Sequence, residues 1–253
     1  MSINWLPQTA LIYVLVFARV GTMIMLMPGF GSQRLPMRMR LTIALVFTFI
    51  MYPLISTNYS ITQITIYPAL HLLFSEILVG LVLGGVARLL LSAAQVAGST
   101  IAFQTGLSFA QTSDPTQGGV QGAIFGNFIA VLGVALIFAM DFHHLVLAAI
   151  YKSYEMFSPG GGIMIADAKD MAVEVIAGSF VVGVQMAAPF IVFGLVFYFG
   201  LGILARLMPQ LQVFFIAMPA NIGIGLLLFV LLLGMMMTWY MNHIEQYLLR
   251  LIG

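Results

Sequence analysis

The sequence contains no cysteine and very few charged residues. Without thiols the chain can form neither disulfides nor cysteine-ligated metal sites, and it lacks a cysteine nucleophile. Only 7% of its 253 residues are charged, whereas about 25% are charged in a typical soluble domain. A water-soluble surface cannot be built from so few charges. The formal net charge of +1 also provides no basic field that would attract nucleic acid.

Apolar sequence takes the place of charge. Hydrophobic residues make up 62% of the chain, and its mean hydropathy is +1.09. Because about 20 apolar residues span a bilayer, six stretches predict an all-α, polytopic membrane-type protein of about six long helices. These stretches cover residues 9–28, 39–56, 67–91, 123–150, 172–204 and 212–240. No Lys or Arg precedes the first stretch, so we expect it to be a permanent helix and not a cleavable signal peptide.

The last two stretches are longer than one membrane crossing requires, and each contains a proline. Pro189 lies inside the fifth stretch and Pro219 inside the sixth. Proline removes a backbone donor and clashes with the preceding turn. We therefore expect tilt, a kink or a break in these stretches, with helix breaks assigned to the two prolines. Such breaks persist in a membrane only where protein or water satisfies the freed backbone groups.

Residues 92–122, between the third and fourth stretches, have a different character. They are rich in Gln, Ser and Thr, carry the single charge Asp114, and include several glycines and a proline. The segment is too polar for lipid and too apolar for a solvated linker. We predict a helix up to about Gln104 and then a loop over residues 106–119. Such a segment is expected to line a cavity or an interface.

Three charges, Arg19, Glu76 and Arg88, fall within the apolar stretches. A charge at the bilayer centre is costly and needs a partner, a cavity or protein surroundings. These residues would form an ion or proton path, or else a structural salt bridge between Arg19 and Glu76 with Arg88 snorkelling near a helix end. The structural interpretation is favoured, because relays usually need more than one acidic group and only Glu76 lies deep in a stretch.

No pattern indicates an enzyme. The sequence has no His-Glu-x-x-His pair, no frame for an activated serine and no Walker loop, so we expect no catalysis and no cofactor. Neighbouring His143 and His144 diverge by about 100° on a helix and cannot readily chelate one ion. Asp141 nearby leaves a weak carboxylate–histidine site open, but a helix end at the membrane interface is the favoured interpretation, and no metal is expected.

Glycines recur at four-residue spacing in two places, at Gly80 and Gly84 and at Gly118, Gly122 and Gly126. On a helix this spacing makes a smooth stripe that permits close backbone approach. Docking of a neighbouring subunit and ordinary packing within the chain are equally compatible with it.

Several short patterns occur in an order that is typical of one protein family. The first are Phe17–Gly21, Met27–Gly31 and Leu35–Arg40, which lead to a helix that ends at Pro53. The later ones are Gln104–Ala110 with Asp114–Pro115, then Arg206–Gln210 and Met218–Pro219. Together they cover nearly the whole chain. In this order and spacing the chain resembles the FliR family of flagellar export proteins and its virulence-secretion counterparts.

The resemblance implies a core subunit of the flagellar type III protein export gate, in the bacterial inner membrane at the flagellar basal body. One copy would assemble with FliP and FliQ homologues into a helical complex, with FlhA and FlhB homologues as neighbours and unfolded flagellar proteins as substrates. Within a single membrane-type domain of residues 1–253, residues 1–170 would be FliP-like and residues 172–253 a FliQ-like hairpin. The helices would be raised towards the periplasm and buried largely against partners.

The resemblance also implies that the mid-chain loop plugs the closed pore. Phe109, with Leu107 and Ala110, would form an apolar stopper. The residues assigned to this plug are Gly106, Leu107, Ser108, Phe109, Ala110, Gln111, Asp114, Pro115, Gly118 and Gly119. The charges assigned to burial and assembly are Arg19, Glu76, Arg88 and Arg206, and the resemblance implies that Arg19 and Glu76 meet protein partners instead of lipid.

Two other functions remain open. A virulence-type secretion gate would carry similar patterns, although the residues in these motifs fit the flagellar branch better. An independent small-solute transporter would need a charged or polar site near the membrane midplane, often at broken helices. No acidic cluster accompanies Pro189 or Pro219.

Overall fold

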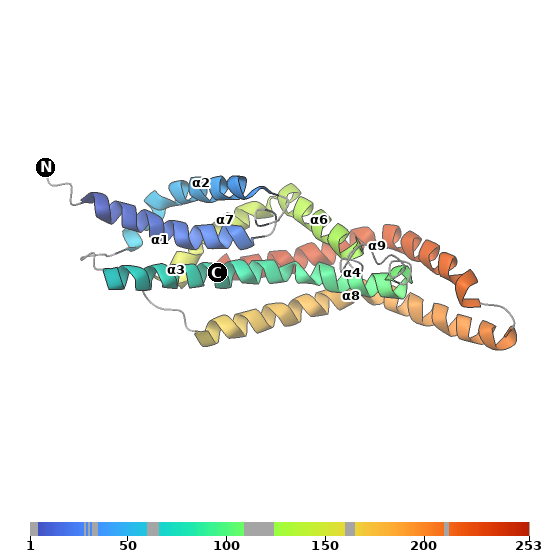
Figure 1. Ribbon diagram of the computed structural model, residues 1–253. Coiled ribbons are helices and arrows are strands. Elements are labelled where there is room, and N and C mark those ends of the chain that lie inside the picture. The colour runs from blue at the N-terminus through green and yellow to red at the C-terminus, as the bar shows by residue number, and fades with distance from the viewer. Residues whose placement is uncertain are drawn as a thin grey trace. The chain divides into compact units, whose positions relative to one another are not determined.

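The computed structural model describes residues 5–27, 29, 31, 35–59, 66–108, 124–159, 165–209 and 213–252. Within these residues it is helical and contains no strand, which confirms the predicted all-α class. The 3-10 turn η1 (Ser56–Asn58) follows the second helix. The helices (Figure 1) are α1 (Trp5–Leu26), α2 (Met37–Ile55), α3 (Ile66–Leu90), α4 (Ser92–Gln104), α6 (Ile124–Ala139), α7 (Phe142–Met156), α8 (Ile165–Leu207) and α9 (Val213–Ile252).

Hydropathy and length make most of these helices candidates for membrane spans. Among the described residues, five helical segments are long and apolar enough to cross a membrane, or six if the bent pair α6 and α7 counts as one span. The five are Gln8–Leu26, Met37–Asn58, Ile66–Gln104, Lys169–Leu207 and Phe215–Arg250. The third combines α3 and α4, which are separated only by Leu91. The predicted polytopic membrane-type architecture is therefore confirmed.

The fourth predicted stretch is two helices instead of one. α6 ends at Ala139, and Met140 and Asp141 form a turn before α7 begins at Phe142. Asp141 has a left-handed backbone with a φ of 60°. That conformation cannot continue a right-handed helix, so the polar residues that begin at Asp141 coincide with a helix boundary.

The expected helix breaks at Pro189 and Pro219 are wrong. Pro189 lies inside the 43-residue α8, and Pro219 lies inside the 40-residue α9. A proline removes one backbone hydrogen bond, but the bonds of the flanking turns remain. Around Pro189, Met186 and Phe190 are fully buried. Their packing helps to hold the helix continuous across the missing bond.

The chain forms two compact units, and each combines distant parts of the sequence. Unit 1 contains Met1–Leu90, Met140–Ile176 and Glu245–Gly253, and unit 2 contains Leu91–Ala139 and Ala177–Ile244. In unit 1, α1 packs on α2 and α3, and α2 also contacts α7. In unit 2, α4 packs on α6. The boundary falls inside α8 and α9, so these two helices contribute to both units.

Small residues make the contact between α4 and α6 close. A Cβ atom added at Gly98 would collide with the backbone of Gly126, and one added at Gly126 would press on Gln95. Gln95 also donates a hydrogen bond to Asn127 at 3.4 Å. Gly126, one member of the second glycine stripe, therefore serves packing within the chain, whereas Gly118 and Gly122 lie outside the described residues.

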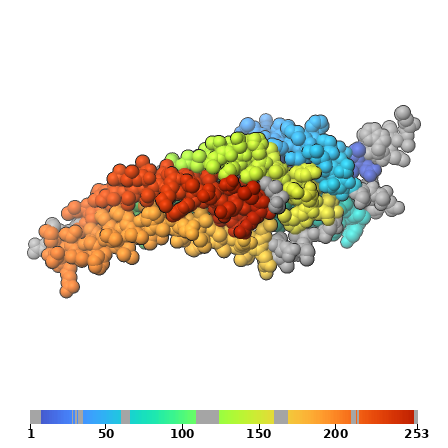
Figure 2. Space-filling view, turned by 180° about the vertical axis from the view of Figure 1, so that it is seen from behind, coloured from blue at the N-terminus to red at the C-terminus, as the bar shows by residue number. Residues whose placement is uncertain are grey.

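Much of the surface of α8 and α9 is apolar. In Figure 2 these helices run from yellow-orange to red. Only 28% of the most apolar stretch of α8 and 17% of that of α9 is buried, compared with 50% for α1. Leu195, Phe199, Val230 and Leu231 are each at least 70% exposed. Apolar surface on this scale requires cover from lipid or from other protein chains.

Candidate functional site

A buried ion pair joins α1 to α3 in unit 1. Arg19 is 1% exposed and Glu76 is fully buried. Nε of Arg19 donates to one carboxylate oxygen of Glu76 at 2.5 Å, and Nη2 donates to the other at 3.1 Å. This bidentate arrangement is the strong form of such a pair. The structure thus contains the salt bridge that the sequence favoured, and a carboxylate bound at both oxygens suits a structural anchor better than a proton relay.

The third guanidinium nitrogen of Arg19 and the planar face of the group also have partners. Nη1 donates to the backbone carbonyl of Ser153 in α7 at 2.9 Å. The guanidinium carbon lies 4.0 Å from the ring centroid of Tyr154, a favourable cation–π distance. One cation therefore ties together three helices, and Ser153 lies 134 residues from it in sequence.

Tyr59, just after η1, closes this cluster. Its ring packs edge-on against Tyr154 with centroids 6.4 Å apart. Burial raises the pKa of its hydroxyl far above the ordinary value, so Tyr59 is neutral at physiological pH. Sequence reasoning found Arg19 and Glu76 but missed Ser153, Tyr154 and Tyr59. A backbone carbonyl leaves no sequence signature, and a tyrosine in a polar connection such as 56–60 or 151–155 carries no sign of its partner.

Glycines bring α3 close to α1 beside the ion pair. A Cβ atom added at Gly80 would collide with the side chain of Thr22 and the carbonyl of Arg19. One added at Gly84 would press on Leu26 and on the backbone of Met23. The Gly80–Gly84 stripe therefore serves packing within the chain, which answers the question that the spacing left open.

Gly80→Ala is expected to lower the free energy of unfolding by about 1–3 kcal/mol, because the added methyl group overlaps backbone that cannot rotate away. Gly85→Ala is the matched control, since a Cβ atom there meets nothing within 4 Å. It should gain about 0.5–1 kcal/mol from helix propensity. Unfolding of the two variants in detergent checks this, and equal stability would show that α1 and α3 are less tightly packed.

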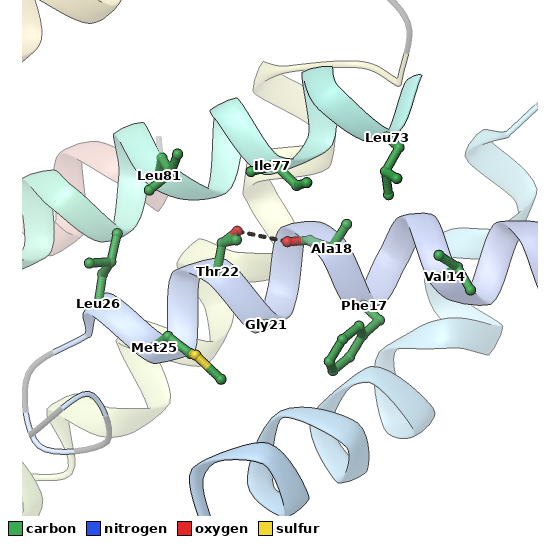
Figure 3. Close-up of a pocket in the computed structure, with 10 residues that line it drawn as sticks. All are labelled: Val14, Phe17, Ala18, Gly21, Thr22, Met25, Leu26, Leu73, Ile77 and Leu81. Carbon is green, nitrogen blue, oxygen red and sulfur yellow. Dashed lines mark hydrogen bonds between the residues drawn. The ribbon is translucent and has the colours of Figure 1, made fainter. Parts of the chain in front are cut away.

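An apolar groove of about 450 Å³ opens between α1 and α3. The groove is lined by Val14, Phe17 and Met25 of α1 and by Leu73, Ile77 and Leu81 of α3, all of which are labelled in Figure 3. Thr22 also lines the groove, but its hydroxyl donates to the carbonyl of Ala18 in its own helix at 2.7 Å (Figure 3). The groove offers apolar contacts, so it suits a hydrocarbon chain or an apolar side chain and not a charged solute.

In unit 2, the start of the mid-chain loop is held against α8 and α9. α4 ends at Gln104, and Gly106 follows with a φ of 74°. Its N–H donates to the carbonyl of Phe103 at 3.2 Å, as at a left-handed helix end. Asn221 of α9, only 2% exposed, donates to the carbonyl of Gln104 and to the hydroxyl of Tyr198, each at 3.3 Å. This polar cluster fixes where the loop begins.

Glycines on the two long helices let the end of α4 pack closely. A Cβ atom added at Gly194 of α8 would collide with the side chain of Gln104, and one at Gly225 of α9 would collide with Thr105. Asn221 was missed from the sequence, although it is the only amide in the apolar run from Val213 to Met241. An isolated amide in such a run is a usable sign of a polar contact.

The proposed plug is only partly visible. Gly106 is buried, and Leu107 and Ser108, which follow it, are half-buried. The other residues assigned to the plug lie outside the described residues, so their role stays a prediction. They are Phe109, Ala110, Gln111, Asp114, Pro115, Gly118 and Gly119.

Arg88 and Arg206, the other two charges assigned to assembly, lie in the last turns of α3 and α8. A cation near a helix C-terminus interacts favourably with the helix dipole. Both residues are exposed in this chain. Burial of either one would require a partner subunit.

Comparison with known proteins adds family information to this geometry. The family model described as bacterial export proteins, family 1, matches residues 10–247. A flagellar biosynthetic protein FliR of Caulobacter vibrioides is 43% identical over 226 residues, which cover 89% of this chain and 90% of that protein. Its counterpart in Bacillus subtilis is 30% identical over 233 residues, 91% and 89% of the two chains. Yop proteins translocation protein T of Yersinia pestis is 23% identical over 241 residues, 94% and 92% of the two chains.

Proposed function

Because this chain belongs to the bacterial export proteins of family 1 and is a membrane component of flagellar type III protein export, we propose that it is a structural subunit of the export gate. One copy assembles with FliP-like and FliQ-like subunits around a channel for unfolded flagellar proteins. FlhA-like and FlhB-like proteins lie beside it in the basal body at the inner membrane. The chain provides channel wall and catalyses no reaction.

Exposed apolar surface on α8 and α9 is too long for lipid alone to cover, and this observation carries the proposal. Exposed apolar side chains extend from Val173 to Leu207 on α8 and from Phe215 to Leu249 on α9. At 1.5 Å per residue, each surface is about 50 Å long. The hydrocarbon core is about 30 Å thick, and a helix tilted by 40° crosses about 39 Å of it. Apolar helices of other subunits are the natural cover for the rest.

The positions of the charges and the lengths of the helices support a chain of two parts with different roles. Residues 1–170, with α1 to α7, form the FliP-like part, and residues 172–253, with most of α8 and α9, form the FliQ-like hairpin. The Arg19–Glu76 pair stabilises the first part from inside. The second part presents the long apolar surfaces, which suits repeated packing against similar hairpins and a position raised towards the periplasm.

The loop after Gly106 acts as the plug of the closed channel. Its start is fixed by Asn221 and Tyr198, while the residues that follow include Leu107 and Phe109, which suit an apolar stopper. An anchored start with a glycine at the hinge lets a loop swing without displacing the helix before it.

The native mass of the complex tests this function. The chain, tagged at its C-terminus, is expressed together with the proteins encoded by neighbouring genes. The native mass of the detergent-solubilised complex is then measured. We expect one large, defined complex with one copy of this chain and several copies of two smaller helical proteins. A monomer, or an oligomer of this chain alone, would overturn the gate proposal and favour an independent transporter.

A further inference from the structure

Three metal-ligating side chains meet at the start of α7 in unit 1. Asp141 immediately precedes the helix, and His143 and His144 lie in its first turn. Each can offer one ligand atom, and these atoms all lie within 4.8 Å of one another. The two imidazole rings are 4.2 Å apart between centroids and tilted by 37°. The neighbouring histidine rings therefore lie against each other, although successive helical positions point in directions about 100° apart.

The spacing is close to that of a metal site. Bonds from zinc to imidazole nitrogen and carboxylate oxygen are about 2.0–2.2 Å long, which places neighbouring ligand atoms of a tetrahedral site roughly 3.3–3.6 Å apart. Because a metal ion lies near the plane of each imidazole that binds it, closing these separations requires shifts of about 1 Å together with a rotation of the exposed His144 ring. Asp141 and His144 are exposed, so they can make such movements without repacking the core.

The carboxylate of Asp141 is not used as a helix cap. An aspartate at this position normally accepts a hydrogen bond from an N–H group in the first turn. Asp141 instead has φ 60° and ψ 16°, and its side chain makes no such bond. Its oxygens are therefore not committed to the helix end.

We propose that Asp141, His143 and His144 bind one divalent transition metal ion, with Zn²⁺ as the preferred ion. Two imidazoles and a carboxylate suit zinc, cobalt, nickel and ferrous iron, whereas magnesium and calcium prefer oxygen ligands throughout. Three protein ligands leave a fourth position for water or for a side chain of another subunit. This site is separate from the ion pair and the mid-chain loop, and it does not depend on the proposed gate function.

A metal here strengthens the first turn of α7. The opposite end of the same helix provides Ser153 and Tyr154 to Arg19. An ion that binds only the folded chain raises its stability in proportion to the logarithm of the ion concentration over its dissociation constant. Zinc binding therefore supports the helix that completes the surroundings of the buried ion pair.

Cobalt and zinc titrations of the full chain test the site. The protein is purified in detergent without a histidine tag, and Co²⁺ is followed by its visible absorption. We expect one Co²⁺ per chain with the spectrum of a tetrahedral site, displaced by Zn²⁺. The double variant His143→Gln/His144→Gln should bind at least tenfold more weakly. Asp141→Gly should also weaken binding while keeping the fold, because glycine adopts the left-handed conformation readily.

His71→Gln is the matched control, since His71 is an exposed histidine on α3. It should leave the affinity and the spectrum unchanged. Unfolding of each variant without metal establishes that the site variants are folded. No stoichiometric binding, or binding that persists unchanged in the double histidine variant, would overturn the proposal and indicate adventitious surface binding only.

Discussion

Neutralising either member of the Arg19–Glu76 pair is expected to lower the free energy of unfolding by about 3–5 kcal/mol, because each substitution leaves one buried charge without its partner. Arg19→Met leaves the fully buried carboxylate of Glu76, and Glu76→Leu leaves a guanidinium that is 1% exposed. Arg19→Met also removes the donor for the carbonyl of Ser153 and the cation over Tyr154. Denaturant unfolding in detergent and the yield of assembled complex measure both effects.

The double variant Arg19→Met/Glu76→Leu should lose clearly less stability than the sum of the two single variants, since no unpaired charge remains buried. Exchanging the two charges, Arg19→Glu/Glu76→Arg, should restore stability only in part. A glutamate at position 19 has no donor for the carbonyl of Ser153. The structure therefore predicts that the chain tolerates an apolar pair at positions 19 and 76 better than a reversed ion pair.

Glu174→Gln provides the matched control for the charge series. Glu174 pairs with Arg250 at 2.5 Å, but both side chains are more than 60% exposed. An exposed pair contributes about 0–1 kcal/mol, so this variant should differ little from the unaltered chain. Additive losses in the double variant at 19 and 76, or single variants as stable as the control, would show that burial of this pair does not govern stability.

Hydropathy was sufficient to predict most of the helices, because nearly every described helix is apolar along most of its length, but it did not separate α6 from α7. The Arg19–Glu76 pair was predictable for a related reason. Few charges occur in the apolar stretches, and each is costly there unless it is paired. Two charges of opposite sign are therefore expected to form an ion pair. Continuity through Pro189 was not predictable in this way, since it depends on buried neighbours such as Phe190 that no local rule identifies.

Features that depend on tertiary contacts were missed. The carbonyl of Ser153 reaches Arg19 only because α7 folds back onto α1, and Asn221 meets Gln104 only because α9 packs on the end of α4. The turn at Asp141 shows the same limit. Its polar side chains indicated a helix end, but its left-handed backbone, which brings two histidines and a carboxylate together, had no signal in the apolar pattern.

Opening the proposed plug is expected to make the assembled gate conduct small ions. The double variant Leu107→Ser/Phe109→Ser removes the apolar stopper, and residues 107–117 can be deleted for a larger effect. We expect a several-fold higher ion conductance in cells that express the gate, measured by electrical recording or by dye uptake. Thr112→Ala/Ser113→Ala is the matched control within the same loop, and it should leave conductance unchanged because the stopper remains.

The anchor at Asn221 makes a second, graded version of this experiment possible. Asn221→Ala removes the donor to the carbonyl of Gln104 and to Tyr198 without altering the loop itself. If the loop closes the pore only when its start is fixed, this variant should leak more than the unaltered gate and less than the stopper variant. The native mass of each complex separates the two ideas. Normal assembly with unchanged conductance in all variants would reject the plug and leave the gate proposal standing, whereas failed assembly of the unaltered chain would reject both.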